Sequence, residues 1–186
     1  MNIEEGMILY HGSYTIVDNP DLQKCEKGRD FGKGFYLTSS RLQATKFVKP
    51  SIYKAIVSGV ILPDTNVGYV SRFKVKSISD LNTYVFKSTD KEWLNCIVGH
   101  RKRNSIPNEV KKWQSYDVIS GKIAADSTNI VLTAYMEGIY GQINSEEAIS
   151  TAIKFLEPEN LKDQYCFRSE KALFTLEYLD YGRVMI

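Results

Sequence analysis

The sequence predicts an α+β fold in a single domain that spans residues 1–186. The length lies within the roughly 100–200 residues typical of one domain. Hydrophobic residues make up 43% and charged residues 25%, so the chain can fill a core and is neither disordered nor fibrous. Helix-capping signals are interspersed with short strand-like segments, and no internal repeat is present.

The first third of the chain contains two predicted strands. An apolar run over residues 7–10 forms the first strand, which ends at His11-Gly12-Ser13 and so places the histidine at a strand end. Residues 18–30 are rich in turn-forming residues without sustained periodicity, so we expect a loop there. A turn that contains two glycines then leads into a second strand within residues 31–38.

A helix follows this second strand. Ser39 or Ser40 can cap it, because a serine side chain accepts a hydrogen bond from a free N–H of the first turn. Apolar residues within 42–48 supply its buried positions. We expect the helix to end before Pro50, since proline has no backbone N–H and its ring clashes with the preceding turn.

The middle of the chain continues the mixture of strands and helices. Alternation and aromatic content predict strands over residues 69–75 and 84–86. Thr89 and Glu92 have the spacing of a capping box, which predicts a helix start. Residues 116–119 have the apolar character of a buried strand.

Two more helices are predicted before the last segment. Residues 130–136 form a short helix that stops near Gly138, because glycine favours the backbone conformation of a helix end. Asn144 with Glu147 gives a second box-like start.

The last segment is predicted to be a strand followed by a helix. Residues 164–167 have the aromatic content of a strand. Ser169 can cap a helix in which Leu176 and Leu179 are apolar positions.

Charge and cysteine content limit the classes of function. The net charge of +2 excludes a surface wholly devoted to polyanions, and the basic cluster at residues 101–103 is short enough to be a solvated face. The three cysteines lie far apart and show neither a disulfide framework nor a zinc-site spacing. Without a signal peptide or an apolar run of about 18 residues, we expect a soluble, cytoplasmic protein that is not bound to a membrane.

Two motifs carry the functional signal. The first is Tyr10-His11-Gly12-Ser13. The second is Asp30-Phe31-Gly32-Lys33-Gly34-Phe35-Tyr36-Leu37-Thr38, whose tyrosine lies 25 residues after the histidine. Together they resemble the ADP-ribosyltransferase superfamily, in the branch of poly(ADP-ribose) polymerases and diphtheria toxin. With a late segment over residues 160–173, the chain more narrowly resembles an uncharacterised bacterial family of that superfamily.

The resemblance implies a split, twisted β-sheet with flanking helices and a cleft that holds NAD in a bent form. His11 would contact the adenosine-side ribose, and Tyr36 would stack against nicotinamide. The cofactor-binding residues implied in this way are His11, Gly12, Ser13, Gly34, Phe35 and Tyr36. Taken alone, however, His11 is more readily explained as a structural hydrogen-bonding residue.

The third catalytic position departs from the pattern. The superfamily usually has a glutamate at the beginning of a late strand, where this chain has Gln164. Glutamine can orient a ribose but brings no negative charge to stabilise an oxocarbenium-like transition state. Glu170 is the rival candidate, and its alternative role is that of an acid in the first turn of the helix capped by Ser169.

The resemblance therefore implies a mono-ADP-ribosyltransferase that uses NAD as a co-substrate and needs no metal. The acceptor is open among a protein, a nucleic acid and a small molecule. Two alternatives remain at this stage: an NAD glycohydrolase, in which water replaces the acceptor, and a non-catalytic NAD or ADP-ribose binding module, which the glutamine at position 164 favours.

Overall fold

The computed structural model describes residues 2–101, 111–123, 128–156 and 162–186. Helices and strands are interspersed along the chain, which confirms the predicted α+β class. The strands are β1 (Ile8–Ser13), β2 (Phe35–Leu37), β3 (Val67–Val75), β4 (Thr83–Val85), β5 (Val118–Lys122), β6 (Asp163–Phe167) and β7 (Leu176–Met185). The helices are η1 (Leu22–Lys24), α1 (Arg41–Val57), α2 (Lys91–Arg101), α4 (Thr128–Met136), α5 (Glu146–Leu156) and α6 (Glu170–Phe174).

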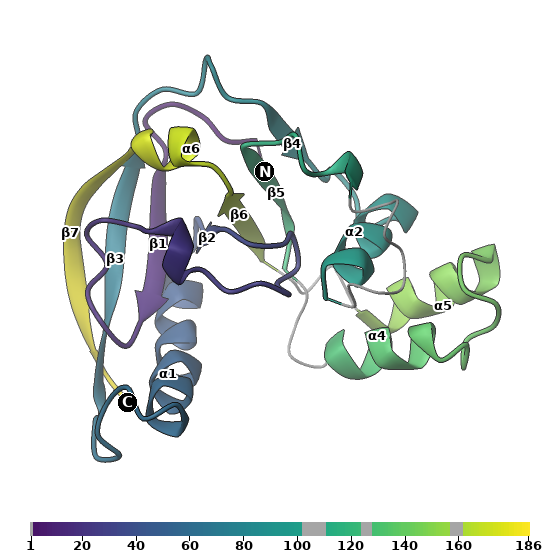
Figure 1. Ribbon diagram of the computed structural model, residues 1–186, viewed down its shortest axis with the longest axis horizontal. Coiled ribbons are helices and arrows are strands. Elements are labelled where there is room, and N and C mark those ends of the chain that lie inside the picture. The colour runs from purple at the N-terminus through teal and green to yellow at the C-terminus, as the bar shows by residue number, and fades with distance from the viewer. Residues whose placement is uncertain (1, 102–110, 124–127, 157–161) are drawn as a thin grey trace.

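The strands form two sheets. One is antiparallel with the order β1-β3-β7, and the other has the order β2-β6-β5-β4, in which β4 and β5 are parallel. The sheets meet at an isolated bridge between Tyr10 and Thr38. Each of these residues donates its N–H to the carbonyl of the other, at 2.8 and 3.0 Å. In Figure 1, α1 lies against the first sheet, whereas α2, α4 and α5 lie together beyond the second.

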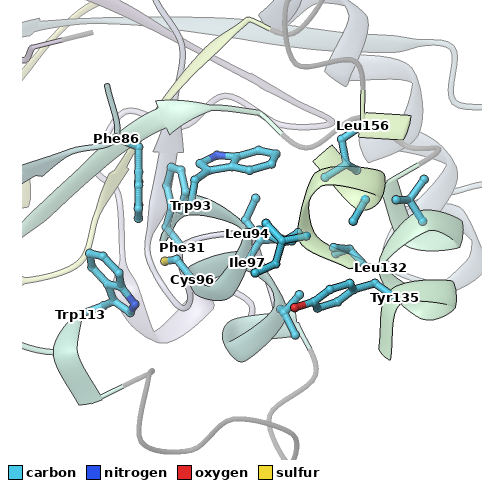
Figure 2. Packing of buried hydrophobic residues seen from close by; sticks show 14 of the residues in the cluster. Phe31, Phe86, Trp93, Leu94, Cys96, Ile97, Trp113, Leu132, Tyr135 and Leu156 are labelled. Carbon is cyan, nitrogen blue, oxygen red and sulfur yellow. The ribbon is translucent and has the colours of Figure 1, made fainter. Parts of the chain in front are cut away.

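The largest core cluster packs α2, α4 and α5 against one face of the second sheet. Trp93 and Trp113 are completely buried in it. Figure 2 shows Leu132 and Tyr135 of α4 and Leu156 of α5 beside Leu94 and Ile97 of α2. A second cluster, which includes Leu9, Phe35, Phe73, Tyr165 and Phe167, joins the two sheets to each other.

Helix α1 begins as expected but does not end at Pro50. The Ser40 side chain accepts a hydrogen bond from the Gln43 N–H at 3.3 Å. The helix then continues through Pro50 to Val57. Its buried face, made of Ala44, Val48, Ile52 and Ala55, runs across the proline and packs on β1 and β3. Because Pro50 is on the exposed side, the carbonyl that loses a partner can be solvated, and packing outweighs the cost of the proline.

Two predicted capping boxes are each displaced by one residue. Asp90, rather than Thr89, caps α2, because its carboxylate accepts hydrogen bonds from the N–H groups of Glu92 and Trp93 at 3.0 and 3.1 Å. The carboxylate also lies where the helix dipole favours negative charge.

The start of α5 shows the same displacement. Ser145, rather than Asn144, caps this helix through the Ala148 N–H at 3.2 Å. Asn144 has a positive φ of 70° and belongs to the preceding turn. The predicted helices α4 and α5 therefore exist, but the second one starts after a different residue.

The predicted C-terminal helix is mostly a strand. Ser169 caps α6 through the Ala172 N–H at 3.1 Å, but α6 ends at Phe174. Leu176 and Leu179 lie in β7, which pairs along its length with β3. This long antiparallel pairing outweighs a helical spacing of two leucines, since helix propensity is only a weak determinant. No helix of the described residues is both long and apolar enough to cross a bilayer.

Candidate functional site

His11 lies at the junction of the two sheets. Strand β1 ends at Ser13, within the predicted His11-Gly12-Ser13 segment, but His11 lies inside the strand rather than at its end. The backbone of His11 pairs with Ser71 of β3. Its side chain reaches the other way, and Nδ1 donates a hydrogen bond to the Tyr36 carbonyl of β2 at 2.8 Å.

This side-chain hydrogen bond occupies the place of a missing backbone pair. Continued antiparallel pairing from the bridge between Tyr10 and Thr38 would set Gly12 opposite Tyr36. In the described residues that pair does not form, and the imidazole of His11 takes the Tyr36 carbonyl instead. The N–H and C=O of Gly12 face this gap, since alternate residues of a strand direct these groups to the same side.

The surroundings of His11 favour its neutral form. Burial lowers the pKa of His11 below its usual 6.5, the bond to the Tyr36 carbonyl opposes this effect, and the positive charge of Arg29 lowers the pKa further. The ring also packs on Phe35, with ring centroids 4.6 Å apart. Because Nδ1 carries the donated proton, the Nε2 atom of the neutral ring is a hydrogen-bond acceptor.

Tyr36 is held by the turn that precedes it. Its hydroxyl donates to the Gly32 carbonyl at 2.8 Å and accepts from the Phe31 N–H at 2.9 Å. Burial raises the pKa of Tyr36 well above its ordinary value, so the phenol stays neutral. The partly buried side chain packs against the cluster around α2, on the face of β2 opposite to Phe35.

Two glycines of this turn are required by close packing. Gly32 has a φ of +85°, and a Cβ there would lie 2.5 Å from the ring of the buried His100. A Cβ at Gly34 would lie 2.5 Å from the Cys166 Sγ and 2.7 Å from the Phe167 carbonyl oxygen. The turn is therefore pressed between α2 and β6, which fixes the entry into β2.

Gly12 and Ser13 are also accounted for by packing. A Cβ at Gly12 would lie 1.9 Å from the carbonyl oxygen of Ala44, so the glycine lets α1 approach β1. Ser13 is buried, and its hydroxyl accepts a hydrogen bond from the Thr15 N–H at 3.5 Å. The side chain of Ser13 thus contacts its own loop, while Gly12 has backbone groups at the gap beside His11.

Gln164 is buried in a charged network. Its Nε2 donates to Asp30 at 2.8 Å and to the Lys122 carbonyl at 3.3 Å. The other Asp30 oxygen accepts from Arg101 Nε at 2.6 Å. Because Asp30 is only 4% exposed, its charge needs this guanidinium and this amide. The segments before β2, at the end of α2 and at the start of β6 are joined in this way.

Glu170 occupies a different setting. It is exposed in the first turn of α6, immediately after the Ser169 cap. Its negative charge acts on Cys25, so it faces the loop that holds η1. This is the position of an acid that stabilises a helix N-terminus.

The structure thus brings together His11, Phe35 and Tyr36, whereas Gln164 joins the motif through Asp30. Sequence reasoning missed Asp30 and Arg101 as partners. Arg101 is not a solvated residue as expected, because its side chain is 18% exposed and paired with Asp30. Lys102 and Arg103 of the same basic cluster lie outside the described residues. The only signal for the pair was an acid directly before the glycine turn and a basic residue at a helix end.

Residues 7–178 match a family described as a protein of unknown function (DUF3990). The chain belongs to this DUF3990 family. The match runs from the start of β1 into β7 and contains all the candidate site residues described above. No curated protein matches this DUF3990 chain.

Proposed function

We propose that this DUF3990 protein is a mono-ADP-ribosyltransferase, which cleaves the nicotinamide–ribose bond of NAD and transfers ADP-ribose to an acceptor. The proposal includes an ADP-ribosyltransferase-like split sheet, with the split between β1 and β2. The observation that carries it is the interrupted pairing at Gly12, where the imidazole of His11 takes the Tyr36 carbonyl and the backbone edge of Gly12 stays open.

The free edge of Gly12 suits the carboxamide of nicotinamide. Its N–H is a donor and its C=O an acceptor, and both would be satisfied by a planar amide that takes the place of the missing strand partner. The ring of Tyr36 offers a flat face for stacking against a pyridine ring. Tyr36 is held in place by its two hydrogen bonds to the preceding turn, so it needs little ordering on binding.

The other groups suit the ribose and the phosphates. Nε2 of a neutral His11 can accept a hydrogen bond from a ribose hydroxyl. Arg29 lies close enough to act on the charge of His11, and its guanidinium has the geometry to bind a pyrophosphate. A bent dinucleotide would then extend from the open edge of Gly12 towards this arginine.

The reaction needs positioning more than a covalent catalyst. The glycosidic C–N bond breaks with its electron pair leaving on nicotinamide, the acceptor attacks the ribose carbon, and the acceptor loses a proton to solvent. Positioning and electrostatic stabilisation supply on the order of several kcal/mol to such a step. In the proposed site Gln164 orients the ribose, and Glu170 is the rival candidate for the third position.

A second candidate function is a non-catalytic NAD or ADP-ribose binding module. The observation that favours it is the hydrogen bond from Gln164 to Asp30, which leaves a neutral, already engaged amide at the third position. Binding at Gly12, His11 and Tyr36 does not depend on that position. The glycohydrolase alternative uses the same site with water as acceptor.

Incubation with NAD labelled in the adenylate portion separates these functions. Release of nicotinamide with label on a macromolecule supports the transferase, and release with free ADP-ribose supports the glycohydrolase. Saturable binding without release supports the binding module. Absence of saturable NAD binding would reject all three.

Variants at position 36 provide the matched test. Tyr36→Phe keeps the stacking ring, so its NAD binding should stay within about threefold of wild type, whereas Tyr36→Ala and His11→Ala should each weaken binding by about tenfold or more. Equal NAD binding by Tyr36→Ala and Tyr36→Phe would contradict the stacking role. Gln164→Ala and Glu170→Ala in the same assay assign the third position.

A further inference from the structure

A hollow beside the segment that leads into β1 is lined by acidic residues. Its volume is about 600 Å³, and it lies between the segment before β1, the second residue after β2 and the start of β6. The residues that line it are Asn2, Glu4, Glu5, Gly6, Met7, Ser39, Asp163 and Tyr165. We call this feature the acidic hollow.

The acidic segment at its rim is fixed by backbone hydrogen bonds. The Met7 N–H donates to the Glu4 carbonyl at 3.2 Å, and the Gly6 N–H donates to the Val75 carbonyl at 2.8 Å. Gly6 adopts a φ of +81°, which a glycine tolerates without strain. The turn therefore holds Glu4 and Glu5 against the end of β3, beside the start of β1.

The charge of the hollow is only partly compensated. Asp163 pairs with the Lys122 ammonium at 3.4 Å. Glu4 and Glu5 form no ion pair with any residue that the structure describes. Three carboxylates thus face one ammonium, and a cation that entered the hollow would gain favourable electrostatic energy.

Tyr165 supplies a second and independent indication of a ligand. The residue is 1% exposed, yet it lines the hollow. No described residue is hydrogen-bonded to its hydroxyl, and this oxygen is not fully enclosed by protein, so it is open to a partner from the hollow. Burial first, and then the charges of Asp163 and Glu4, raise the pKa of Tyr165 to about 12. The hydroxyl is therefore a neutral group that lies near two carboxylates and lacks a partner in the described chain.

The spread of these carboxylates selects the kind of cation. In the described residues, no group of three or more His, Cys, Asp or Glu side chains is arranged to hold a metal ion. A hollow of about 600 Å³ is also much larger than a metal ion. A guanidinium or ammonium group on an alkyl chain has several N–H donors, and these can reach carboxylates and a hydroxyl that lie apart.

We propose that the acidic hollow binds an organic cation, namely an alkylguanidinium or alkylammonium group, through Glu4, Glu5, Asp163 and the Tyr165 hydroxyl. This group is carried both by arginine or lysine side chains and by small free amines. The proposal does not depend on NAD and is tested without it.

The test is an NMR titration of the full chain with butylguanidinium and with butylurea, its uncharged isostere. Butylguanidinium should bind saturably and shift the amides of residues 4–7, 39 and 163–165, and butylurea should not. Saturable binding of both compounds with similar affinity, or shifts from butylguanidinium that lie elsewhere, would overturn the proposal.

Variants locate the site. Removal of charge by the double substitution Glu4→Gln and Glu5→Gln, and separately Tyr165→Phe, should weaken butylguanidinium binding by about tenfold, as expected for a lost charge-assisted hydrogen bond. Glu137→Gln removes a carboxylate from an exposed residue outside the hollow and should leave binding unchanged. Equal effects of all three variants would show only non-specific attraction and reject the site. Parallel titrations with an arginine tripeptide, a lysine tripeptide and putrescine then show which source of the cation binds most tightly.

Discussion

The contact between Gln164 and Asp30 explains why a glutamine suits this position. Asp30 is paired with Arg101 and can only accept hydrogen bonds, so its neighbour must donate one. A glutamine amide does so, whereas an ionised glutamate would set two buried carboxylates against each other. The third position is thus determined by its neighbour on the loop before β2.

Gln164→Glu should therefore destabilise the protein at neutral pH. We expect the free energy of unfolding to fall by about 2 kcal/mol or more. The hydrogen bond to Asp30 would be lost, and two buried carboxylates that can only accept hydrogen bonds would face each other. The introduced carboxyl has its pKa raised in the folded state, so its cost is largest at high pH and decreases as pH falls and the group takes up a proton. Urea unfolding at pH 5 and pH 8 measures this difference.

Gln164→Met is the control for that experiment. It keeps the size of the side chain and removes the hydrogen bond without adding a charge. Its difference from wild type should change little between the two pH values. If Gln164→Glu showed the same pH-independent difference, the proposed carboxylate repulsion would be wrong.

Among the elements, the packing of α1 on β1 depends on one glycine. Gly12→Ala should lower the free energy of unfolding by about 3 kcal/mol, because the new Cβ would lie 1.9 Å from the Ala44 carbonyl and the helix must move. Gly28→Ala is the comparison, since a Cβ there meets nothing within 4 Å and only the positive φ of 79° costs about 1 kcal/mol. Thermal and urea unfolding of both variants give the two values. A cost at Gly12 no larger than that at Gly28 would contradict the close contact.

The same elements show what the sequence can and cannot predict. Most strands and helices were predicted in their correct order, because apolar runs and capping residues act locally. The continuation of α1 through Pro50 and the strand after Phe174 were not predicted. Packing of α1 on the first sheet and pairing of β7 with β3 determine these two features, and both depend on residues far away in the sequence. A local pattern has no information on such partners.

The sequence likewise predicted one part of the candidate site and missed another. The histidine and tyrosine motifs were predicted as neighbours, and they contact each other through the imidazole and the Tyr36 carbonyl. The pairing of Asp30 with Arg101 was not predicted, because 71 residues separate the two and the ion pair exists only after folding. The roles of His11 and Tyr36 in NAD chemistry stay predictions.

For the whole molecule, His11 makes folding stability depend on pH. Its pKa in the folded state lies below 6.5, so as pH falls below that value the unfolded chain takes up a proton that the folded chain does not. The free energy of unfolding should thus decrease from pH 7.5 to pH 5.5. His11→Gln, whose amide can still donate to the Tyr36 carbonyl, should show a smaller decrease over that range.

The comparison uses urea unfolding of both proteins at several pH values. The difference between them isolates His11, since all other titrating groups, including His100, are common to both. A difference that stays constant from pH 5.5 to pH 7.5 would show that His11 titrates alike in the folded and unfolded chains.

The junction of the two sheets has one more consequence. Where β1 and β2 would otherwise form the next backbone pair, the ring of His11 stands between the two strands and uses one of the two carbonyl acceptors that this pair would need. The imidazole thereby keeps β1 and β2 apart and prevents their backbone pairing from continuing. Loss of that ring would free Gly12 and Tyr36 to join directly, and the molecule would exchange an open backbone edge for one more ordinary pair of peptide hydrogen bonds.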